Sequence, residues 1–321
     1  MNRTSIEWTH RPQTGGPKGG FTWNPIRAQR SRQLADGADQ KWGGSTGTFC
    51  TRISPGCKNC YASTINKRFG TGAEYTVPNL ANHEFFIDPR ILDEPVHRKK
   101  PATIFVGDMF DLFHEAIPSE LIEEVFLAIV AAKQHTFQIL TKRAERMQRW
   151  VSACMYRPHP HIWFGVSVEN QACADERIPL LLETPAAVRF LSVEPLLEAV
   201  SLKALPSRYA DDEHPMLVNR PLLRLDALRG LHYCGTGEFG PMGTKIDWVI
   251  AGGESGPGAR PFNTAWAESI LEQCEEANVP FFMKQLGSNV IQGGERRRKK
   301  DRKGGDWHEW PHELRVREFP A

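Results

Sequence analysis

The alternation that decides the fold begins at Thr103-Ile104-Phe105-Val106, a short run of apolar and β-branched residues. Five more runs of this kind follow, separated by helical patterns and loops. They cover residues 136–140, 162–166, 188–193, 248–251 and 280–283. Because the runs are apolar on both faces, they are typical of parallel strands that helices cover on each side.

Helical patterns lie between several of these runs. Apolar residues at 121, 122, 125, 126, 129 and 130 recur at helical spacing, and further helices are predicted over 144–150, 171–182 and 266–277. A first strand around Trp23 and a helix over 59–69 complete about seven strand–helix units. The expected fold is therefore α/β, a full or partial (β/α) TIM-type barrel, with a flat doubly wound sheet as the alternative.

We predict one barrel domain over residues 1–321, with a loop-rich extension at its N-terminus. Gly-, Arg- and Gln-rich sequence predicts a loop insertion over 27–48. A second insertion, over 200–245, is rich in Pro and Gly and precedes the sixth strand. A basic loop and a C-terminal tail are expected over 293–321.

The composition is that of a globular protein. The chain has 321 residues, 40 Lys plus Arg against 38 Asp plus Glu, a formal net charge of +2 and 40% hydrophobic residues. These values exclude collagen-like, coiled-coil and disordered proteins. No run approaches the ~18 apolar residues of a membrane span, and no signal peptide is recognisable. We therefore expect a cytoplasmic protein without membrane partners.

Three of the seven cysteines, Cys50, Cys57 and Cys60, have the spacing C-x6-C-x2-C in a turn-rich loop that enters a predicted helix. Three thiolates suit a zinc ion with a fourth protein ligand, or a [4Fe–4S] cluster with one iron left open. His83 and His97 are the nearby candidates for a fourth zinc ligand. Unligated loop cysteines are the third possibility. The other four are scattered and are expected to pack or stay free, namely Cys154, Cys173, Cys234 and Cys274.

Motifs along nearly the whole chain resemble a known family. They are residues 5–9, 22–25, 54–62, 111–114, 135–143, 165–169, 192–196, 252–256 and 282–285. The chain is similar to a group of uncharacterised phage and prophage proteins with a three-cysteine motif. That group is related to the radical AdoMet (radical SAM) enzymes and is distantly similar to spore photoproduct lyase. The usual radical AdoMet loop is C-x3-C-x2-C with an aromatic residue before the last cysteine. Here the first gap is six residues and Asn59 holds the aromatic position, so Tyr61 is expected to take over its packing role.

The resemblance implies a cofactor and a reaction. Cys50, Cys57 and Cys60 would ligate three irons of a [4Fe–4S] cluster, and S-adenosyl-L-methionine would chelate the fourth. Reduction by a partner protein would cleave AdoMet to a 5′-deoxyadenosyl radical that abstracts hydrogen from the substrate. The chain would act in a bacterial host cell as a phage or prophage product.

Polar and glycine residues follow the predicted strands, where a barrel places its active site. Candidate cofactor-binding residues are Tyr61, Gly107, Asp108, Ser167, Glu169, Glu194, Gly252, Gly253 and Glu254. Lys142 and His114 are the candidate catalytic residues. Helix caps and strand-end salt bridges are the alternative roles for these polar side chains.

One strongly basic run indicates a possible nucleic-acid partner. Contact with DNA or RNA phosphates is expected through Arg296, Arg297, Arg298, Lys299 and Lys300. A solvated loop is the alternative. The functional hypothesis is a radical AdoMet enzyme that acts on a nucleic acid or a nucleotide-like substrate. The alternative is a zinc-binding or non-catalytic phage protein that binds nucleic acid.

Overall fold

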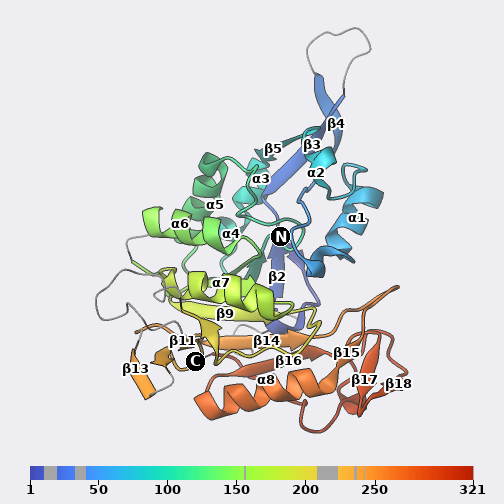
Figure 1. The fold of residues 1–321 in the computed structure, drawn as a ribbon. Helices are drawn as coiled ribbons and strands as arrows, with labels where there is room; N and C mark the ends of the chain where they lie inside the picture. Colours follow the sequence, from blue (N-terminus) through green and yellow to red (C-terminus); the bar gives the residue numbers. More distant parts are fainter. Residues whose placement is uncertain are drawn as a thin grey trace. The chain divides into compact units, whose positions relative to one another are not determined.

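A computed structural model describes residues 1–10, 20–32, 41–154, 157–207, 223–234, 237–241 and 243–320. The chain is mixed α/β with mostly parallel central strands, as the sequence predicts (Figure 1). It divides into two compact units. The first is Met1–Arg146 with His159–Trp163, and the second is Met147–Pro158 with Phe164–Ala321. None of the described helices has the length and apolar character needed to span a membrane.

The central strands of the first unit lie in the order β1-β2-β6-β7. Their bounds are β1 Asn2–Arg3, β2 Gly20–Trp23, β6 Thr103–Val106 and β7 Thr136–Thr141. The last three are parallel, with Val106 opposite both Trp23 and Ile139. Every residue of β2 and β6 is buried, which explains why the sequence shows them as continuous apolar runs rather than as an alternation. Their C-terminal ends lead into the loops that carry the candidate site.

Helices follow these strands. They are η1 Glu7–Thr9, η3 Pro55–Cys57, α1 Tyr61–Phe69, α2 Val77–Leu80, α3 Pro89–Leu92, α4 Glu94–His97 and α5 Ser119–Ala131. Helix α6, Ala144–Cys154, begins in the first unit and ends in the second. In α5 the buried residues Ile122, Val125, Phe126 and Ile129 recur at helical spacing, which is the pattern that predicted this helix.

The predicted loop insertion over 27–48 is wrong in part, because it contains two strands. β3 (Ile26–Arg32) pairs antiparallel with β4 (Lys41–Gly47) and with β5 (His83–Ile87). Figure 1 shows β3 and β4 as the blue hairpin of the first unit. Ile26 and Ala28 are buried whereas Arg27 and Gln29 are partly exposed, so β3 has the alternation of a half-buried strand. Residues 33–40 and 11–19 lie outside the described residues.

The second unit carries the order β8-β9-β14-β16. The bounds are β8 Ile162–Ser167, β9 Val188–Val193, β14 Trp248–Gly252 and β16 Phe281–Gln285, with the first two residues of β8 assigned to the first unit. β14 is parallel to both β9 and β16. The helices α7 (Gln171–Glu183) and α8 (Thr264–Ala277) begin at Asn170 and Asn263, whose side chains accept hydrogen bonds from the first turn.

Two smaller sheets complete the second unit. The predicted insertion over 200–245 holds an antiparallel sheet of β10 (Leu205–Pro206), β11 (Arg224–Asp226), β12 (Leu231–Cys234) and β13 (Gly237–Pro241). Residues 208–222, 235, 236 and 242 within it lie outside the described residues. The other sheet is β15 (Phe262–Asn263), β17 (Val290–Gln292) and β18 (Glu295–Arg297), and the short helix η5 spans Trp307–Glu309.

The segment after Trp310 packs on the edge strand β16. Met283 donates its main-chain N–H to the Val316 carbonyl at 2.9 Å, and Glu318 donates to the Phe281 carbonyl at 2.9 Å. Phe282 and Arg317 form an antiparallel bridge between these two hydrogen bonds. The segment therefore covers the outer edge of β16 with a short stretch of antiparallel pairing.

Candidate functional site

The three cysteines of the C-x6-C-x2-C motif lie on one loop of the first unit. The loop begins after β4 at Phe49, which is fully buried against Ala28, Ala62 and Tyr75. Cys50 and Cys60 pack against the same small core. Cys57 ends η3, and Cys60 precedes the first residue of α1. The core beneath the loop thus fixes both ends of the motif.

The thiols are close enough to affect one another's ionisation. Burial raises the pKa of Cys50 to about 12, and Cys57 and Cys60 add to that increase while Arg143 opposes it. Burial also raises the pKa of Cys60, and Cys57 contributes in the same direction. Burial thus disfavours the thiolate forms of Cys50 and Cys60.

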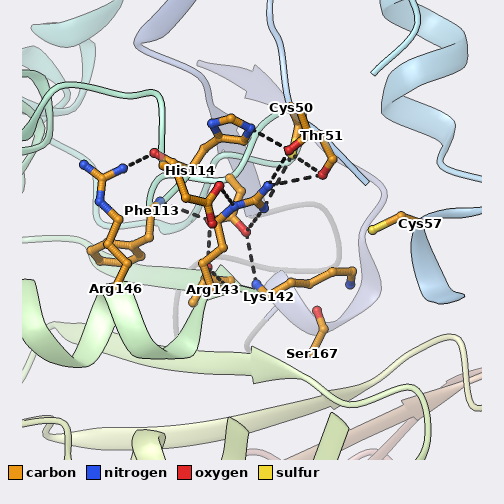
Figure 2. A network of polar contacts seen from close by, with 12 residues as sticks. Cys50, Thr51, Cys57, Phe113, His114, Lys142, Arg143, Arg146 and Ser167 are labelled. Carbon is orange, nitrogen blue, oxygen red and sulfur yellow. Dashed lines mark hydrogen bonds and ion pairs between the residues drawn. The ribbon is translucent and has the colours of Figure 1, made fainter. Parts of the chain in front are cut away.

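A buried arginine connects Cys50 to the end of β7 (Figure 2). The Arg143 side chain is 3% exposed and forms an ion pair with Asp111 at 3.0 Å. Its Nη2 donates to the carbonyl and the hydroxyl of Thr51 at 3.2 and 3.0 Å, and its Nη1 lies 3.7 Å from Cys50 Sγ. Its Nε donates to Glu115 at 2.8 Å. The guanidinium thus holds the residue that follows Cys50 and places positive charge beside its sulfur.

Asp111 is fixed by the chain around it. Its carboxylate accepts hydrogen bonds from the Thr141 hydroxyl at 2.7 Å and from the main-chain N–H groups of Lys142 and Phe113 at 3.0 Å each. Burial alone would raise its pKa, but Arg143 and these donors hold the pKa below its usual value. Burial likewise opposes the charge on Arg143, yet Asp111 and Glu115 raise the pKa of Arg143 above its ordinary value. Both side chains are therefore charged inside the first unit.

The predicted catalytic residue His114 belongs to the same network. Its Nε2 is 2.9 Å from the Thr51 hydroxyl, and its Nδ1 accepts the Ala116 N–H at 3.1 Å. Burial, with the nearby Arg143, lowers the pKa of His114 to about 4. The imidazole is therefore neutral at pH 7. Arg146 donates to the His114 and Ile117 carbonyls and so fixes the loop from the other side.

Lys142, the other predicted catalytic residue, follows β7 and is half-buried. Its main chain is held by Asp111, and in Figure 2 its side chain extends toward Cys57. Its positive charge also lowers the pKa of Cys60, in opposition to burial. Lys142 and Arg143 thus bring two cations to the cysteine loop.

The structure brings the predicted residues Tyr61, Gly107 and Asp108 together beside the loop. The Tyr61 hydroxyl donates to the Asp108 carbonyl at 2.7 Å, and Asn24 donates to the Asp108 carboxylate at 2.7 Å. Burial raises the pKa of Asp108. Gly107 has φ +78°, and a Cβ there would lie 2.9 Å from the Phe110 carbonyl oxygen, so this turn requires glycine.

The other predicted cofactor-binding residues lie in the second unit. Glu169 is buried and pairs with Arg177 at 2.9 Å, and Arg177 also donates to the Ser167 carbonyl. Glu194 pairs with Lys284 at 3.1 Å. Gly252 and Gly253 lie in close contacts: a Cβ on Gly252 would be 2.5 Å from the Glu194 side chain, and a Cβ on Gly253 would be 2.2 Å from the Leu286 carbonyl oxygen. Glu254 pairs with Arg260 at 2.6 Å. The salt-bridge alternative thus describes the contacts of all three carboxylates.

The residues that link the cysteine loop to β7 were missed by the sequence analysis. Thr51, Glu115 and Arg143 are each next to a predicted site residue in the sequence, and the motifs at 111–114 and 135–143 include Asp111 and Arg143. A signal was present, because a carboxylate and a guanidinium in two motifs that follow neighbouring parallel strands can pair at their ends. Sequence reasoning chose Lys142 and His114 from those motifs instead.

The proposed zinc ligands have other contacts. His83 Nδ1 bonds the Asn79 carbonyl at 2.7 Å, and its ring stacks on Phe49 with centroids 4.1 Å apart. His97 Nδ1 bonds the Asp93 carbonyl at 2.9 Å. Across the part of the chain that the structure describes, no three His, Cys, Asp or Glu side chains converge as ligands of a single metal ion.

Comparison with known proteins gives one match. The model of a family described as "Protein of unknown function (DUF5131)" matches residues 36–313. No curated protein and no solved structure matches the chain.

Proposed function

The chain belongs to the family of unknown function whose model matches residues 36–313, and we propose from its cysteine site that it is a radical AdoMet enzyme. Cys50, Cys57 and Cys60 hold a [4Fe–4S] cluster in this proposal, and S-adenosyl-L-methionine binds beside it. The observation that carries the proposal is a single loop with three cysteines, two of them packed on one small core, and a buried guanidinium 3.7 Å from the Cys50 sulfur.

The donor set fits the cluster. Three cysteines leave one of four irons open to a further ligand, and soft thiolates are the ligands that iron–sulfur clusters take. Burial raises the pKa of the Cys50 thiol, so binding of a metal centre there would have to displace the thiol proton. When bound, the reduced cluster and AdoMet supply the radical that abstracts hydrogen from the substrate.

The chain's own residues would orient this centre and offset part of its negative charge. Arg143 donates toward Cys50 and, with Lys142, offsets part of the negative charge of three thiolates. Asp111 fixes both residues, through the Arg143 guanidinium and the Lys142 main chain. Tyr61 and Asp108 stay our candidates for AdoMet contact next to the loop. A (β/α) barrel and cofactor contacts from the second unit remain predictions, as does a cytoplasmic location in a bacterial host.

The substrate class in this proposal is a nucleic acid or a nucleotide-like molecule. Arg296, Arg297 and Arg298 are exposed at the end of the β17–β18 hairpin. The chain beyond them is ordered by Glu309, which accepts the N–H groups of Lys300 and Asp301 at 2.7 and 3.0 Å. A presented row of arginines suits phosphate contact. The second candidate function, a zinc-binding or non-catalytic protein that binds nucleic acid, shares this observation.

The test is anaerobic purification followed by analysis of iron, sulfide and zinc, and then addition of dithionite and AdoMet. We expect about four irons per chain, an absorbance near ~400 nm that bleaches on reduction, and release of 5′-deoxyadenosine. Stoichiometric zinc without iron after reconstitution would overturn the proposal and favour the second candidate.

Matched cysteine variants locate the centre. Cys57→Ala should lose the cluster, whereas Cys154→Ala, at an exposed cysteine of α6, should keep it. Equal iron and sulfide content in the two purified variants would contradict the ligand assignment.

A further inference from the structure

An apolar surface lies next to the cysteine loop. Seven large hydrophobic side chains are exposed among the residues that the structure describes, and five of them fall between positions 53 and 77. We call these five the apolar face, and they are Ile53, Tyr61, Ile65, Phe69 and Val77. Phe69 is the most exposed at 74%, followed by Val77 at 66%. Exposed apolar side chains that gather in one short segment indicate an interaction site rather than scattered surface residues.

Helix α1 presents most of this face. Tyr61, Ile65 and Phe69 are spaced four residues apart and therefore lie on one side of the helix. Its buried residues are the small or polar Ala62, Ser63 and Asn66. A surface helix normally buries its large apolar residues, so α1 has the reverse arrangement. The helix directs toward solvent the side chains that a partner would be expected to cover.

The surroundings of the apolar face are basic. Residues 51–73 contain Arg52, Lys58, Lys67 and Arg68 and no Asp or Glu. All four cations are exposed, and the Arg68 guanidinium lies 4.8 Å from the centre of the Phe69 ring. Glu74, just beyond this segment, pairs with one of them, Lys67, at 2.7 Å. An apolar centre with a positive rim complements an acidic surface with an apolar centre.

We infer that the apolar face is the docking surface for an acidic electron-carrier protein that reduces the centre held by Cys50, Cys57 and Cys60. The inference rests on the proposed function, which requires an external reductant. Ile53 lies between Cys50 and Cys57, and Tyr61 follows Cys60, so a partner on this face contacts the cysteine loop itself.

Three features favour a protein over a nucleic acid as the occupant. Three of the five side chains are aliphatic, whereas nucleic-acid interfaces are more polar. Tyrosine, phenylalanine and arginine together are the side chains enriched in protein interfaces. The face is also limited to α1, the first residue of α2 and the loop before α1, which suits the small interfaces of transient redox complexes.

The reaction at this surface is a single electron transfer. One electron leaves the flavin or iron–sulfur group of the carrier, which is oxidised, and enters the cluster, which is reduced. No covalent bond forms or breaks. The carrier then dissociates in its oxidised form.

Binding of a reduced bacterial flavodoxin and of a [2Fe–2S] ferredoxin to the full chain tests the inference. Phe69→Gln and Arg68→Glu should each weaken the binding of at least one carrier about tenfold, since a hot-spot side chain contributes about 1.4 kcal/mol or more. The matched controls are Leu127→Gln, which replaces a side chain 64% exposed on α5, and Lys133→Glu, an exposed charge elsewhere in the first unit. Both controls should bind like the wild type. Stopped-flow reduction of the cluster by the carrier should slow in parallel, while reduction by dithionite should not change.

Several outcomes would overturn the inference. One is that neither carrier binds the wild type, and another is that both carriers bind the face variants and the controls with equal affinity. Light scattering that shows a dimer dissociated by Phe69→Gln would assign the face to a second copy of the chain. Loss of oligonucleotide binding in the same variants, without loss of carrier binding, would assign it to nucleic acid. Iron analysis tests the proposed function separately. Carrier binding can be measured whether or not iron is present, so failure of one proposal is distinguishable from failure of the other.

Discussion

Arg143 and Asp111 place two opposite charges inside the first unit. Each would be costly alone, because a buried charge loses its hydration. Together they satisfy each other and connect the end of β7 to the residue after Cys50. The pair therefore has a structural role, which holds the loop, and an electrostatic role, which sets the charge beside a sulfur.

Removal of one partner should be far more damaging than removal of an exposed charge. Asp111→Asn leaves the Arg143 guanidinium buried with a weaker acceptor, so we expect the free energy of unfolding to fall by about 3 kcal/mol. Asp93→Asn, at an exposed position, is the control and should leave the stability nearly unchanged. Urea denaturation of the two variants measures the difference. Equal midpoints would show that the pair does not stabilise the fold.

His114 should make the stability depend on pH. The folded chain keeps this imidazole neutral down to about pH 4, whereas the unfolded chain protonates it below about 6.5. The unfolded state therefore binds more protons between these values, and acid favours it. The stability that neutral His114 contributes is fully present above pH 6.5 and is lost as the pH falls toward 4. Between pH 6.5 and pH 4 the wild type should lose about 3 kcal/mol more stability than His114→Gln.

His114→Gln keeps all the other histidines, so their effects on stability are common to both proteins. Denaturant unfolding at five pH values across this range provides the measurement. Parallel stability curves for the two proteins would contradict the assignment of the pH dependence to His114.

Part of the site was predictable because its residues are chemically distinctive. Three cysteines at short spacing are recognisable in the sequence as a candidate site, and polar residues that follow apolar runs indicate strand ends. Asp111 and Arg143 carry no such mark. Charged residues are usually exposed, so a sequence alone does not indicate that these two meet in the interior. Only the structure shows that the loop after β6 brings Asp111 against Arg143 at the end of β7.

The parallel strands were predictable because burial on both faces makes them apolar throughout, and the described strands β6, β7, β8, β9, β14 and β16 agree with the predicted runs. The β3–β4 hairpin was not predictable in the same way. Its strands contain Arg, Gln and Gly, and β3 also pairs with β5, some fifty residues away. Long-range pairing of this kind outweighs local propensity.

Two tyrosines connect the region of the cysteine loop to the loop after β6. One is Tyr61, at the start of α1, whose hydroxyl donates to the Asp108 carbonyl. The other is Tyr75. Tyr75 is 2% exposed, and its hydroxyl donates to the Met109 carbonyl and contacts the Thr48 hydroxyl, each at 2.7 Å. Because Thr48 is two residues from Cys50, this tyrosine ties the start of the cysteine loop to the loop that carries Asp108.

Tyr75→Phe should lower the free energy of unfolding by about 2 kcal/mol, since the buried Thr48 hydroxyl and the partly buried Met109 carbonyl both lose this hydrogen bond. If the loop holds the proposed cluster, its iron should also be lost faster to a chelator, because the loop is held less firmly. Tyr233→Phe, which removes a hydroxyl bonded to the Lys203 carbonyl in the second unit, is the control. Chelator kinetics that are the same for both variants would show that the tie does not support the cysteine loop.

The net charge of +2 is too small for the whole chain to hold nucleic acid by bulk attraction. Local charge must therefore supply any such affinity. Replacement of Arg296, Arg297 and Arg298 by Gln should reduce the slope of log K against log salt by about 2 to 3 for double-stranded DNA. Neutralisation of Arg90, Lys99 and Lys100 in the first unit is the control. Fluorescence anisotropy with a labelled duplex gives the slopes, and an unchanged slope in the first variant would exclude the run as the phosphate-binding surface.

The residues that cover β16 have a consequence for how the protein can be handled. Without positions 315–320, the edge of that strand would present unpaired main-chain groups next to Phe281, Phe282 and Met283. Such an edge adds strands from other molecules. A shortened chain would therefore be prone to form inclusion bodies during expression, even though this segment contributes no residue to the cysteine site.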